Sequence, residues 1–212
     1  MDMTDDAPRW RRRKTARPAE IIEAALSVFA ETGFAAAKLD EIARRAGVSK
    51  GALYLYFETK EDLFRAAIRG AVTPNLEGIR AVAEAFDGPF AQLAPMILAR
   101  AAYAMSDGRL GAVVKMVVGE SRNFPDLARI WHDDVVAFML DLMTGLIARA
   151  QTRGEVAPGD ARLYAFSLAG PMVMAVLYRE VFVDAGDPPD MQALAAQHAR
   201  TVLHGMLLGD PK

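Results

Sequence analysis

The stretch 39–57, LDEIARRAGVSKGALYLYF, has the residue spacing that two short, closely crossing helices require. Ala43 lies in the middle of the first helix and is small enough to let the second cross nearby. Gly47 can take the left-handed backbone conformation that ends a helix without steric cost. Ser49 can cap the second helix, because its hydroxyl accepts a hydrogen bond from an otherwise unpaired backbone N–H. The contacts between the helices are predicted to come from Leu39, Ile42, Val48 and Leu53. This spacing predicts a helix-turn-helix, which places its second helix in the major groove of DNA.

The distribution of charge fits DNA binding by one end of the chain. Residues 1–60 contain 11 Lys and Arg against 9 Asp and Glu, whereas the rest of the chain contains 14 against 18. The formal net charge of the whole chain is only −2, so the protein is not a basic nucleic-acid coat. A basic end on an acidic body confines the attraction for phosphate to that end.

Composition predicts a cytoplasmic protein without a membrane span. The chain has no cysteine, which excludes disulfides, thiolate zinc sites and catalytic thiols and favours a reducing compartment. The first residues, MDMTDDAPRWRRRKTARP, lack the apolar core of a signal peptide. The longest uncharged apolar run, 163–178, is shorter than the roughly 20 residues that a membrane span needs, and it contains Gly170-Pro171. We therefore expect this run to form a buried helix.

Apolar residues recur with helical period along almost the whole chain, and no stretch alternates convincingly as a strand. The first predicted helix presents Ile22, Leu26 and Phe29 on one face and ends near Gly33. It is followed by the two helices of the helix-turn-helix.

Six further helices are expected after the helix-turn-helix. Thr59 can cap the fourth helix, which should run toward residue 86 with a kink or break near Pro74. The others are predicted at about 89–105, 109–120 and 125–154, one that starts at 160 and bends at 170–171, and one from 190 to 206. Nine helices with short connections predict an all-α protein.

Residues 19–64 resemble the DNA-binding domain of tetracycline-repressor-type (TetR) regulators. The shared motifs are AAL-x-x-F in the first helix, IA-x-x-AGVS-x-G-x-LY-x-YF across the helix-turn-helix, and KEDL in the fourth helix. The chain departs from the family pattern at Ala37 and Lys38, where a Thr or Ser is frequent, and Lys38 would replace a hydroxyl contact to phosphate by a charge. The resemblance implies three helices for DNA and a six-helix body that binds an effector and dimerises. We expect a disordered basic arm at 1–17, a DNA-binding domain at 18–58 and an effector-binding and dimerisation domain at 59–212.

The start of the second helix of the motif is predicted to face DNA. Lys50 can reach phosphate or guanine, and Gly51 lets the backbone approach the duplex. The resemblance implies phosphate contacts from Tyr54 and Tyr56, and Lys60 can add a charged one beside a helix N-terminus. Alternatively, the tyrosines are core aromatics and Lys60 is a solvated charge. The predicted DNA-binding residues are Lys38, Ser49, Lys50, Gly51, Ala52, Tyr54, Tyr56 and Lys60.

For two groups of basic residues, the sequence is compatible with DNA contact or with no contact. The segment RWRRRK at 9–14, with Arg17 beyond it, could enter the minor groove or bind phosphates, or it could be a disordered tail. Arg44 and Arg45 could contact DNA or face solvent.

Large, adaptable apolar side chains in the body are candidates for an effector cavity. Methionine and aromatic side chains line pockets for apolar ligands, although the same residues also make ordinary core. The resemblance implies a cavity built from the fourth to seventh helices, and the composition of the set predicts a lipophilic or aromatic effector. The candidates are Tyr103, Met105, Met116, Trp131, Phe138, Met139, Met143 and Phe166.

The last two predicted helices are candidates for a dimer interface. The run 163–178 is too apolar for a lone surface helix, and its small residues would let another helix approach closely. The resemblance implies a four-helix contact between two subunits. The candidates are Ala169, Val173, Val176, Leu177, Leu194, His198 and Val202.

Signatures of enzymes and metal sites are absent from the sequence. The segment 119–123, GESRN, lacks the final glycine and the preceding strand of a nucleophile elbow. Consecutive His132, Asp133 and Asp134 point to different faces of a helix, so no metal site is predicted, and no cofactor is expected. We interpret the chain as a ligand-responsive transcriptional regulator: a homodimeric repressor of a palindromic operator, released by a small apolar effector. One alternative is an activator, or a regulator without a ligand, that has the same DNA-binding head. The other is a helical enzyme or carrier with a vestigial DNA-binding head.

Overall fold

The computed structural model describes residues 9–106, 108–182, 184 and 186–207, with side chains described from residue 18. Within these ranges every regular element is a helix, and one isolated bridge joins Val156 to Leu207. This confirms the prediction of an all-α fold. The chain divides into two compact units, Met1–Gly70 and Ala71–Lys212, which we call the head unit and the body unit.

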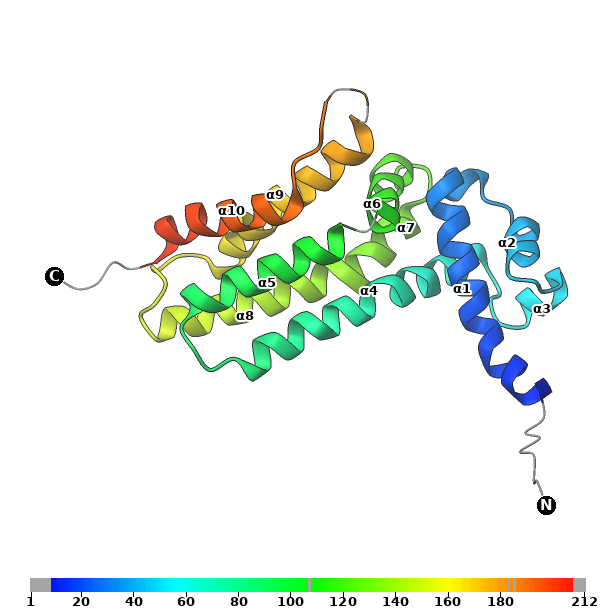
Figure 1. Ribbon diagram of the computed structural model, residues 1–212, viewed down its shortest axis with the longest axis horizontal. Helices are drawn as coiled ribbons and strands as arrows, with labels where there is room; N and C mark the ends of the chain where they lie inside the picture. Colours follow the sequence, from blue (N-terminus) through cyan, green and yellow to red (C-terminus); the bar gives the residue numbers. More distant parts are fainter. Residues whose placement is uncertain (1–8, 107, 183, 185, 208–212) are drawn as a thin grey trace, which may run out of the picture. The chain divides into compact units, whose positions relative to one another are not determined.

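The head unit contains α1 (Arg9–Ala36), α2 (Leu39–Arg45), α3 (Lys50–Tyr54) and the first turns of α4 (Lys60–Ala85) (Figure 1). Helix α2 packs against both α1 and α3. The backbone of residues 9–17 is helical, where the sequence predicted a disordered arm. Residues 1–8 and the side chains of the arm lie outside the described part of the chain.

Three phenylalanine rings form the centre of the head unit. Phe29 and Phe34 stack with their ring centres 5.6 Å apart, and Phe64 meets both edge-on at 5.5 and 5.6 Å. All three are at most 1% exposed. Because Phe64 belongs to α4, the first turns of α4 are part of the head unit, and the division between units falls at residue 70 rather than at the expected 58.

The helix α1 ends in the way its sequence predicted, with one shift of register. Its helical geometry breaks at Gly33, whose φ of 78° and ψ of 168° suit glycine. Ile21 is fully buried, whereas Ile22, predicted to lie on the core face, is half-buried.

The turn between α2 and α3 has the hydrogen bonds of a glycine-terminated helix end. Gly47 has a φ of 66°, and its N–H donates to Arg44 O at 3.2 Å. The N–H of Val48 donates to Ala43 O at 3.0 Å, which completes a Schellman motif. Ile42 and Leu53 are fully buried between the helices, and Leu39 and Val48 are half-buried. The predicted helix-turn-helix is therefore present.

The body unit contains the rest of α4 together with α5 (Phe90–Met105), α6 (Gly108–Glu120), α7 (Pro125–Trp131), α8 (Ala137–Thr152), α9 (Ala161–Val181) and α10 (Met191–Met206) (Figure 1). A π-helical turn, η1 (His132–Val136), joins α7 to α8 without a break, so the predicted helix 125–154 is one segment. Helix α5 packs on α10, and α9 packs on α6, α8 and α10. Buried residues of α5, α8, α9 and α10 form one apolar core.

The N-terminal ends of α9, α10 and α4 are fixed by side-chain caps. Asp160 accepts a hydrogen bond from Leu163 N, and Asp190 accepts one from Ala193 N at 2.7 Å. At the start of α4, Thr59 Oγ1 accepts from Asp62 N at 3.0 Å while Asp62 accepts from Thr59 N at 3.2 Å, which is a reciprocal capping box. Helix α4 runs on through Pro74, so the predicted interruption there is not present.

Two helical segments of the body are apolar and long enough to cross a membrane by length and composition, 125–152 and 161–181. The core helices of soluble proteins meet the same criterion. Both segments contribute buried side chains to the core described above, among them Leu140, Ile147, Leu168 and Met172. Packing within the body unit therefore explains part of their apolar character, since 28% of each apolar window is buried there.

Gly47 provides a test of the turn. Replacing Gly47 by Ala should destabilise the fold by about 1–2 kcal/mol, because a side chain disfavours the left-handed conformation while nothing lies within 4 Å of the added Cβ. The matched control is Gly51→Ala, where the space is equally open but the backbone is helical. It should be neutral or stabilising by up to about 1 kcal/mol. Urea unfolding of both variants measures the difference, and equal stabilities would contradict the role of Gly47.

Candidate nucleic-acid interface

The N-terminal end of α3 is built by a cap and an ion pair. Ser49 Oγ accepts a hydrogen bond from Ala52 N at 3.1 Å, as predicted. Lys50, the first residue of α3, places Nζ 3.0 Å from the carboxylate of Asp40 in the first turn of α2. This hydrogen bond raises the pKa of Lys50 above its ordinary value. Gly51 is exposed with open space around its Cα, and Ala52 is half-buried.

The outer face of α3 is apolar and aromatic. Leu53 is fully buried, so residues two positions away on either side point in roughly the opposite direction. These are Gly51 and Leu55, and Leu55 is 83% exposed. Tyr54 and Tyr56 beside it are 45% and 41% exposed, so neither is a core aromatic.

Leu55 was missed by the sequence analysis. The signal was available, because a helical period anchored on the buried Leu53 places Leu55 on the outer face. Only Leu53 was recognised as part of the pattern, and the apolar character of Leu55 gave no reason to expect exposure. The candidate surface therefore includes Leu55 between the two tyrosines.

Lys60 and Lys38 lie at two other points of the head unit. Lys60 Nζ donates to Ala35 O at 3.3 Å and lies 4.6 Å from the centre of the Phe34 ring. Lys60 is thus in contact with the end of α1 through an exposed hydrogen bond. Lys38 is exposed at the N-terminal boundary of α2, and its side chain makes no capping hydrogen bond.

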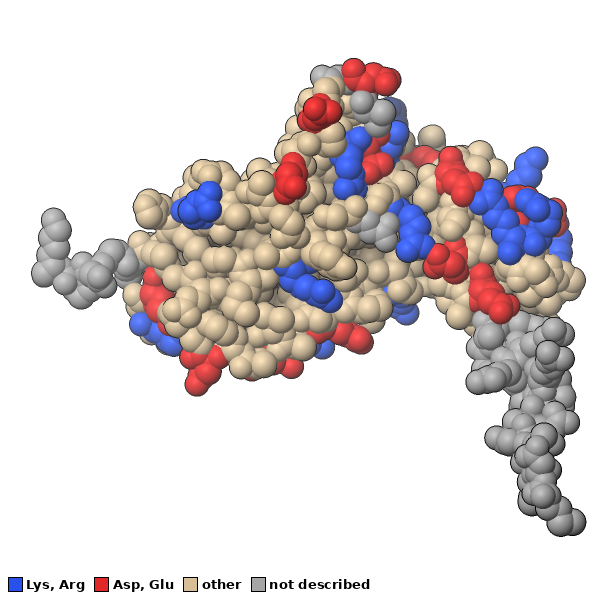
Figure 2. All heavy atoms as spheres, in the orientation of Figure 1, with Lys and Arg blue, Asp and Glu red and all other residues tan. Residues whose placement is uncertain are grey.

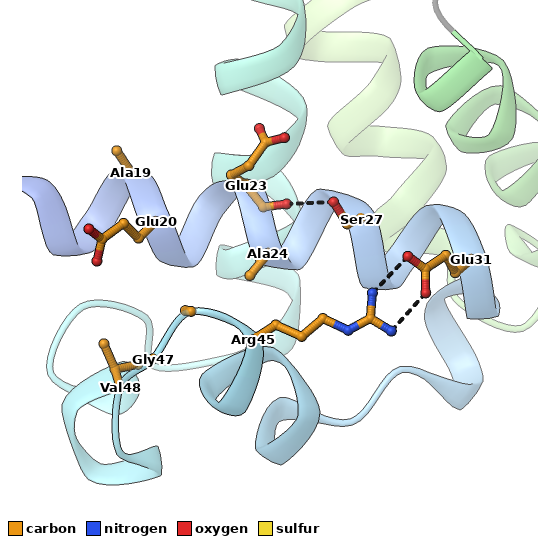
Figure 3. A pocket seen from close by; sticks show the side chains of 10 residues that line it. Ala19, Glu20, Glu23, Ala24, Ser27, Glu31, Arg45, Gly47 and Val48 are labelled. Atoms are coloured by element: carbon orange, nitrogen blue, oxygen red, sulfur yellow. Dashed lines mark hydrogen bonds and ion pairs between the residues drawn. The ribbon is translucent and has the colours of Figure 1, made fainter.

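Arg44 and Arg45 belong to an ion-pair network between α1 and α2. Arg45 meets Glu31 of α1 with two hydrogen bonds of 2.7 Å (Figure 3). It also meets Glu41 with one of 2.8 Å. Arg44 meets Glu41 through Nε at 2.9 Å and Nη2 at 2.6 Å. Hydrogen bonds from Arg44 and then Arg45 lower the pKa of Glu41 to about 2, and the bond from Arg45 lowers the pKa of Glu31. In Figure 2, basic and acidic side chains accordingly lie next to one another over α2 and α3.

A groove of about 1080 Å³ runs between α1 and the α2–α3 turn (Figure 3). Its walls carry Glu20, Glu23 and Glu31 with Arg45, so its charge does not suit a phosphate. The groove lies wholly within the head unit and contains none of the residues predicted to bind an effector.

The predicted effector residues divide by burial. Met116 and Met143 are buried, and Met105, Trp131, Phe138 and Met139 are half-buried. Arg80 lies over the Phe138 ring at 4.5 Å. The other two candidates are on the surface of the subunit, since Tyr103 is 67% and Phe166 is 51% exposed. These two do not line the interior of this subunit.

The predicted interface residues also divide, and one was assigned to the wrong face. Val176 is 2% exposed and belongs to the core of the body unit, because its side of α9 packs inward. Ala169 and Val173 are exposed, and the remaining candidates, Leu177, Leu194, His198 and Val202, are half-buried. His198 Nε2 lies 3.1 Å from Ser167 O.

The outward face of α9 carries a row of exposed apolar side chains. Leu163, Phe166, Val173 and Met174 are 64%, 51%, 41% and 56% exposed. Their spacing of three, seven and one residues keeps them on one side of the helix. We call these four residues the α9 stripe. The face drawn in Figure 2 is mostly uncharged over the body unit.

Within the described ranges, no group of three or more His, Asp or Glu side chains could hold a metal ion. His132 Nδ1 pairs with Asp133 at 2.9 Å, and both side chains are exposed.

The sequence matches two family descriptions. Residues 21–67 match the bacterial regulatory proteins of the tetR family, and residues 94–195 match the tetracyclin repressor-like C-terminal domain. The HTH-type transcriptional repressor BepR of Brucella suis is 36% identical over 158 residues, which cover 69% of this chain and 73% of BepR. The fatty acid metabolism regulator protein of Bacillus subtilis is 29% identical over 157 residues, covering 72% and 77% of the two chains. These relatives are regulators and not enzymes, as predicted for this chain.

A solved structure has the same fold. FadR from Bacillus subtilis, in complex with stearoyl-CoA, superposes with a TM-score of 0.73 at 21% identity, covering 88% of this chain and 98% of FadR. At this identity the likeness concerns the fold alone.

The ion pairs of Glu41 should make stability depend on pH. Because the folded state lowers the pKa of Glu41 to about 2 from 4.5, its contribution is complete above about pH 4.5 and is lost as the pH falls toward 2. Glu41→Gln should therefore be less stable than the parent at pH 7, and the difference should shrink on acidification. Urea unfolding at pH 7, 4 and 3 tests this, with the exposed Glu58→Gln as control. A difference that is as large at pH 3 as at pH 7 would contradict it.

Proposed function

The chain belongs to the TetR family of bacterial regulatory proteins, and we propose that it is a homodimeric repressor that binds a palindromic operator and releases it when a small apolar effector binds. The proposal rests chiefly on one observation, the Ser49-capped helix α3 with an exposed outer face opposite the buried Leu53. A short helix held on its inner side and open on its outer side suits insertion into a major groove. Such a regulator works in the cytoplasm.

In the proposed complex, α3 reads bases and its surroundings hold the backbone. Lys50 donates to guanine, Gly51 lets the helix backbone approach the duplex, and Leu55 meets apolar groups such as a thymine methyl. Tyr54 and Tyr56 donate their hydroxyls to phosphate, which their exposure permits. Lys38, Ser49 and Ala52 complete the contact surface.

Lys60 has a double role in this proposal. Its ammonium group has three donors, and the one that meets Ala35 O ties α4 to the end of α1. Its positive charge also lies at the N-terminus of α4, where the helix dipole attracts a phosphate as well. Lys60 would then hold the head unit together as well as contact DNA.

The dimer contact is proposed to form through the α9 stripe and α10. Four large apolar side chains exposed along one helix favour burial against another chain. A two-fold interface is self-complementary, so the stripe can meet its own copy. The small side chain of Ala169 and the half-buried Leu177, Leu194, His198 and Val202 fit the borders of such a contact. Two heads joined in this way would read the two halves of a palindrome.

The effector is proposed to be an apolar or amphipathic molecule held by the body unit. Met116 and Met143 supply adaptable buried walls, and Met105, Trp131, Phe138 and Met139 supply half-buried ones. The names of a relative and of a solved structure, both from Bacillus subtilis, support a lipophilic compound, since one refers to fatty acid metabolism and the other to a complex with stearoyl-CoA. The effector releases DNA only to the extent that it binds the non-binding arrangement of the dimer more tightly.

The first test is operator recognition. Duplexes selected by the parent from random sequences should contain inverted repeats. Lys50→Ala should weaken binding to them by roughly 1–3 kcal/mol per head through a lost base contact. Leu55→Ala should weaken it by about 1–2 kcal/mol per head through lost apolar burial. Gel shifts measure both, and the exposed Lys115→Ala of α6 controls for charge.

The same gel shifts test the response to an effector. Long-chain acyl-CoA esters and aromatic hydrophobic compounds are added to the parent complex, and at least one class should release the operator. Selected sequences without repeats, or variants that bind like the parent, would contradict the DNA-binding arrangement. Operator binding that none of the apolar compounds changes would contradict the proposal of an apolar effector.

The second test is the dimer. Val173→Asp should convert the protein to monomers with poor operator affinity, because it buries an unpaired charge in the apolar contact. Val118→Asp is the matched control, since Val118 is 63% exposed on α6 and lies outside the stripe. Light scattering at micromolar concentration distinguishes the two. A parent that is itself monomeric would exclude the proposed interface.

A further inference from the structure

The cations of the helix-turn-helix are matched by carboxylates of the same unit. Residues 18–70 contain seven Lys and Arg against eight Asp and Glu. Arg44 and Arg45 are engaged by Glu41 and Glu31. At the start of α3, where a base contact is proposed, Lys50 is engaged by Asp40.

The Asp40–Lys50 pair joins the two helices of the motif at the surface. Nζ of Lys50 is 3.0 Å from each carboxylate oxygen of Asp40, and the side chains are 67% and 53% exposed. An ammonium group has three N–H donors, so a lysine that is paired with one carboxylate can still donate a hydrogen bond to a base. The pair is therefore able to meet DNA without being broken.

We propose that Asp40 is a specificity-determining residue of this regulator: it neutralises Lys50 toward phosphates while leaving it able to hydrogen-bond guanine. The inference rests on the proposed DNA contact of Lys50. Asp40 was not among the residues that the sequence suggested for DNA binding.

The physical reason is that charge and hydrogen bonding differ in range and in target. A free ammonium group attracts phosphates, which every sequence presents, and this attraction supplies non-specific binding. A guanine offers the O6 and N7 acceptors, which are present only at certain positions of the major groove. A paired carboxylate cancels most of the attraction of the ammonium group to phosphates. It weakens the hydrogen bond to guanine less, because base acceptors carry only partial charges.

The expected result is a change in the ratio of two affinities. Asp40→Asn should raise affinity for a shuffled duplex of the same base composition more than affinity for the selected operator. Because this ion pair is exposed, its loss should lower the ratio of operator affinity to shuffled-duplex affinity by about two- to fivefold per head. Both affinities are measured by fluorescence anisotropy at one fixed salt concentration. Circular dichroism confirms that each variant is folded.

A second background tests whether Asp40 acts through Lys50. In Lys50→Gln protein, Asp40 can only repel phosphates, and it repels those of both duplexes. Adding Asp40→Asn to that background should raise both affinities alike and leave their ratio unchanged. Asp141→Asn is the control for the charge change, because Asp141 pairs with Arg162 at 3.5 Å within the body unit.

Each outcome decides the question. An unchanged affinity ratio in Asp40→Asn overturns the proposal. The proposal is also overturned if Asp40→Asn lowers the ratio as much in the Lys50→Gln background as in the parent, because Asp40 would then act by repelling DNA and not through Lys50. A parent that binds neither duplex would instead refute the proposed function itself.

Discussion

The packing of Phe29, Phe34 and Phe64 is the contact on which the DNA-binding arrangement depends. The three rings come from α1, from the residue after the Gly33 break, and from α4. They hold the end of α1 against the start of α4, and the helix-turn-helix occupies the chain between these two helices. Lys60, which is proposed to contact a DNA phosphate, lies over the Phe34 ring and therefore packs against this cluster. A loss of any ring would therefore displace the DNA-facing surface as well as reduce stability.

Between residues 18 and 70, the head unit combines a DNA-binding shape with nearly balanced charge, seven Lys and Arg against eight Asp and Glu. Its helix-turn-helix arginines are bound by Glu31 and Glu41, and Lys50, the lysine of α3, is bound by Asp40. Recognition of DNA by this surface is therefore expected to depend more on hydrogen bonds and apolar contacts to bases than on the attraction of positive charge to phosphates. The sequence concentrates basic residues instead in the segment 9–17, which has no acidic residue. If the alternative that this segment binds phosphates holds, long-range attraction and base reading would come from different parts of the chain.

Features set by neighbouring residues were predictable from the sequence, whereas features set by distant contacts were not. The glycine-terminated turn, the Ser49 cap and the Thr59 cap follow from short-range hydrogen-bonding rules, and all three are present. The place of Lys60 beside Ala35 could not be predicted, because it joins residues 25 positions apart. The same holds for the Asp40–Lys50 and Glu31–Arg45 pairs, which bridge separate helices.

Helix α9 shows a different limit of sequence reasoning. Its inward side chains, such as Leu168, Met172 and Val176, are as apolar as the outward Phe166 and Val173. A helix that is apolar all round gives no periodic contrast from which to assign its faces, and Val176 was consequently placed on the wrong one. The same property makes the segment resemble a membrane span by composition. Both observations have one explanation if the helix is buried on one side by its own subunit and on the other by a second copy. In that arrangement, the apolar outward side is what allows two DNA-binding heads to be joined.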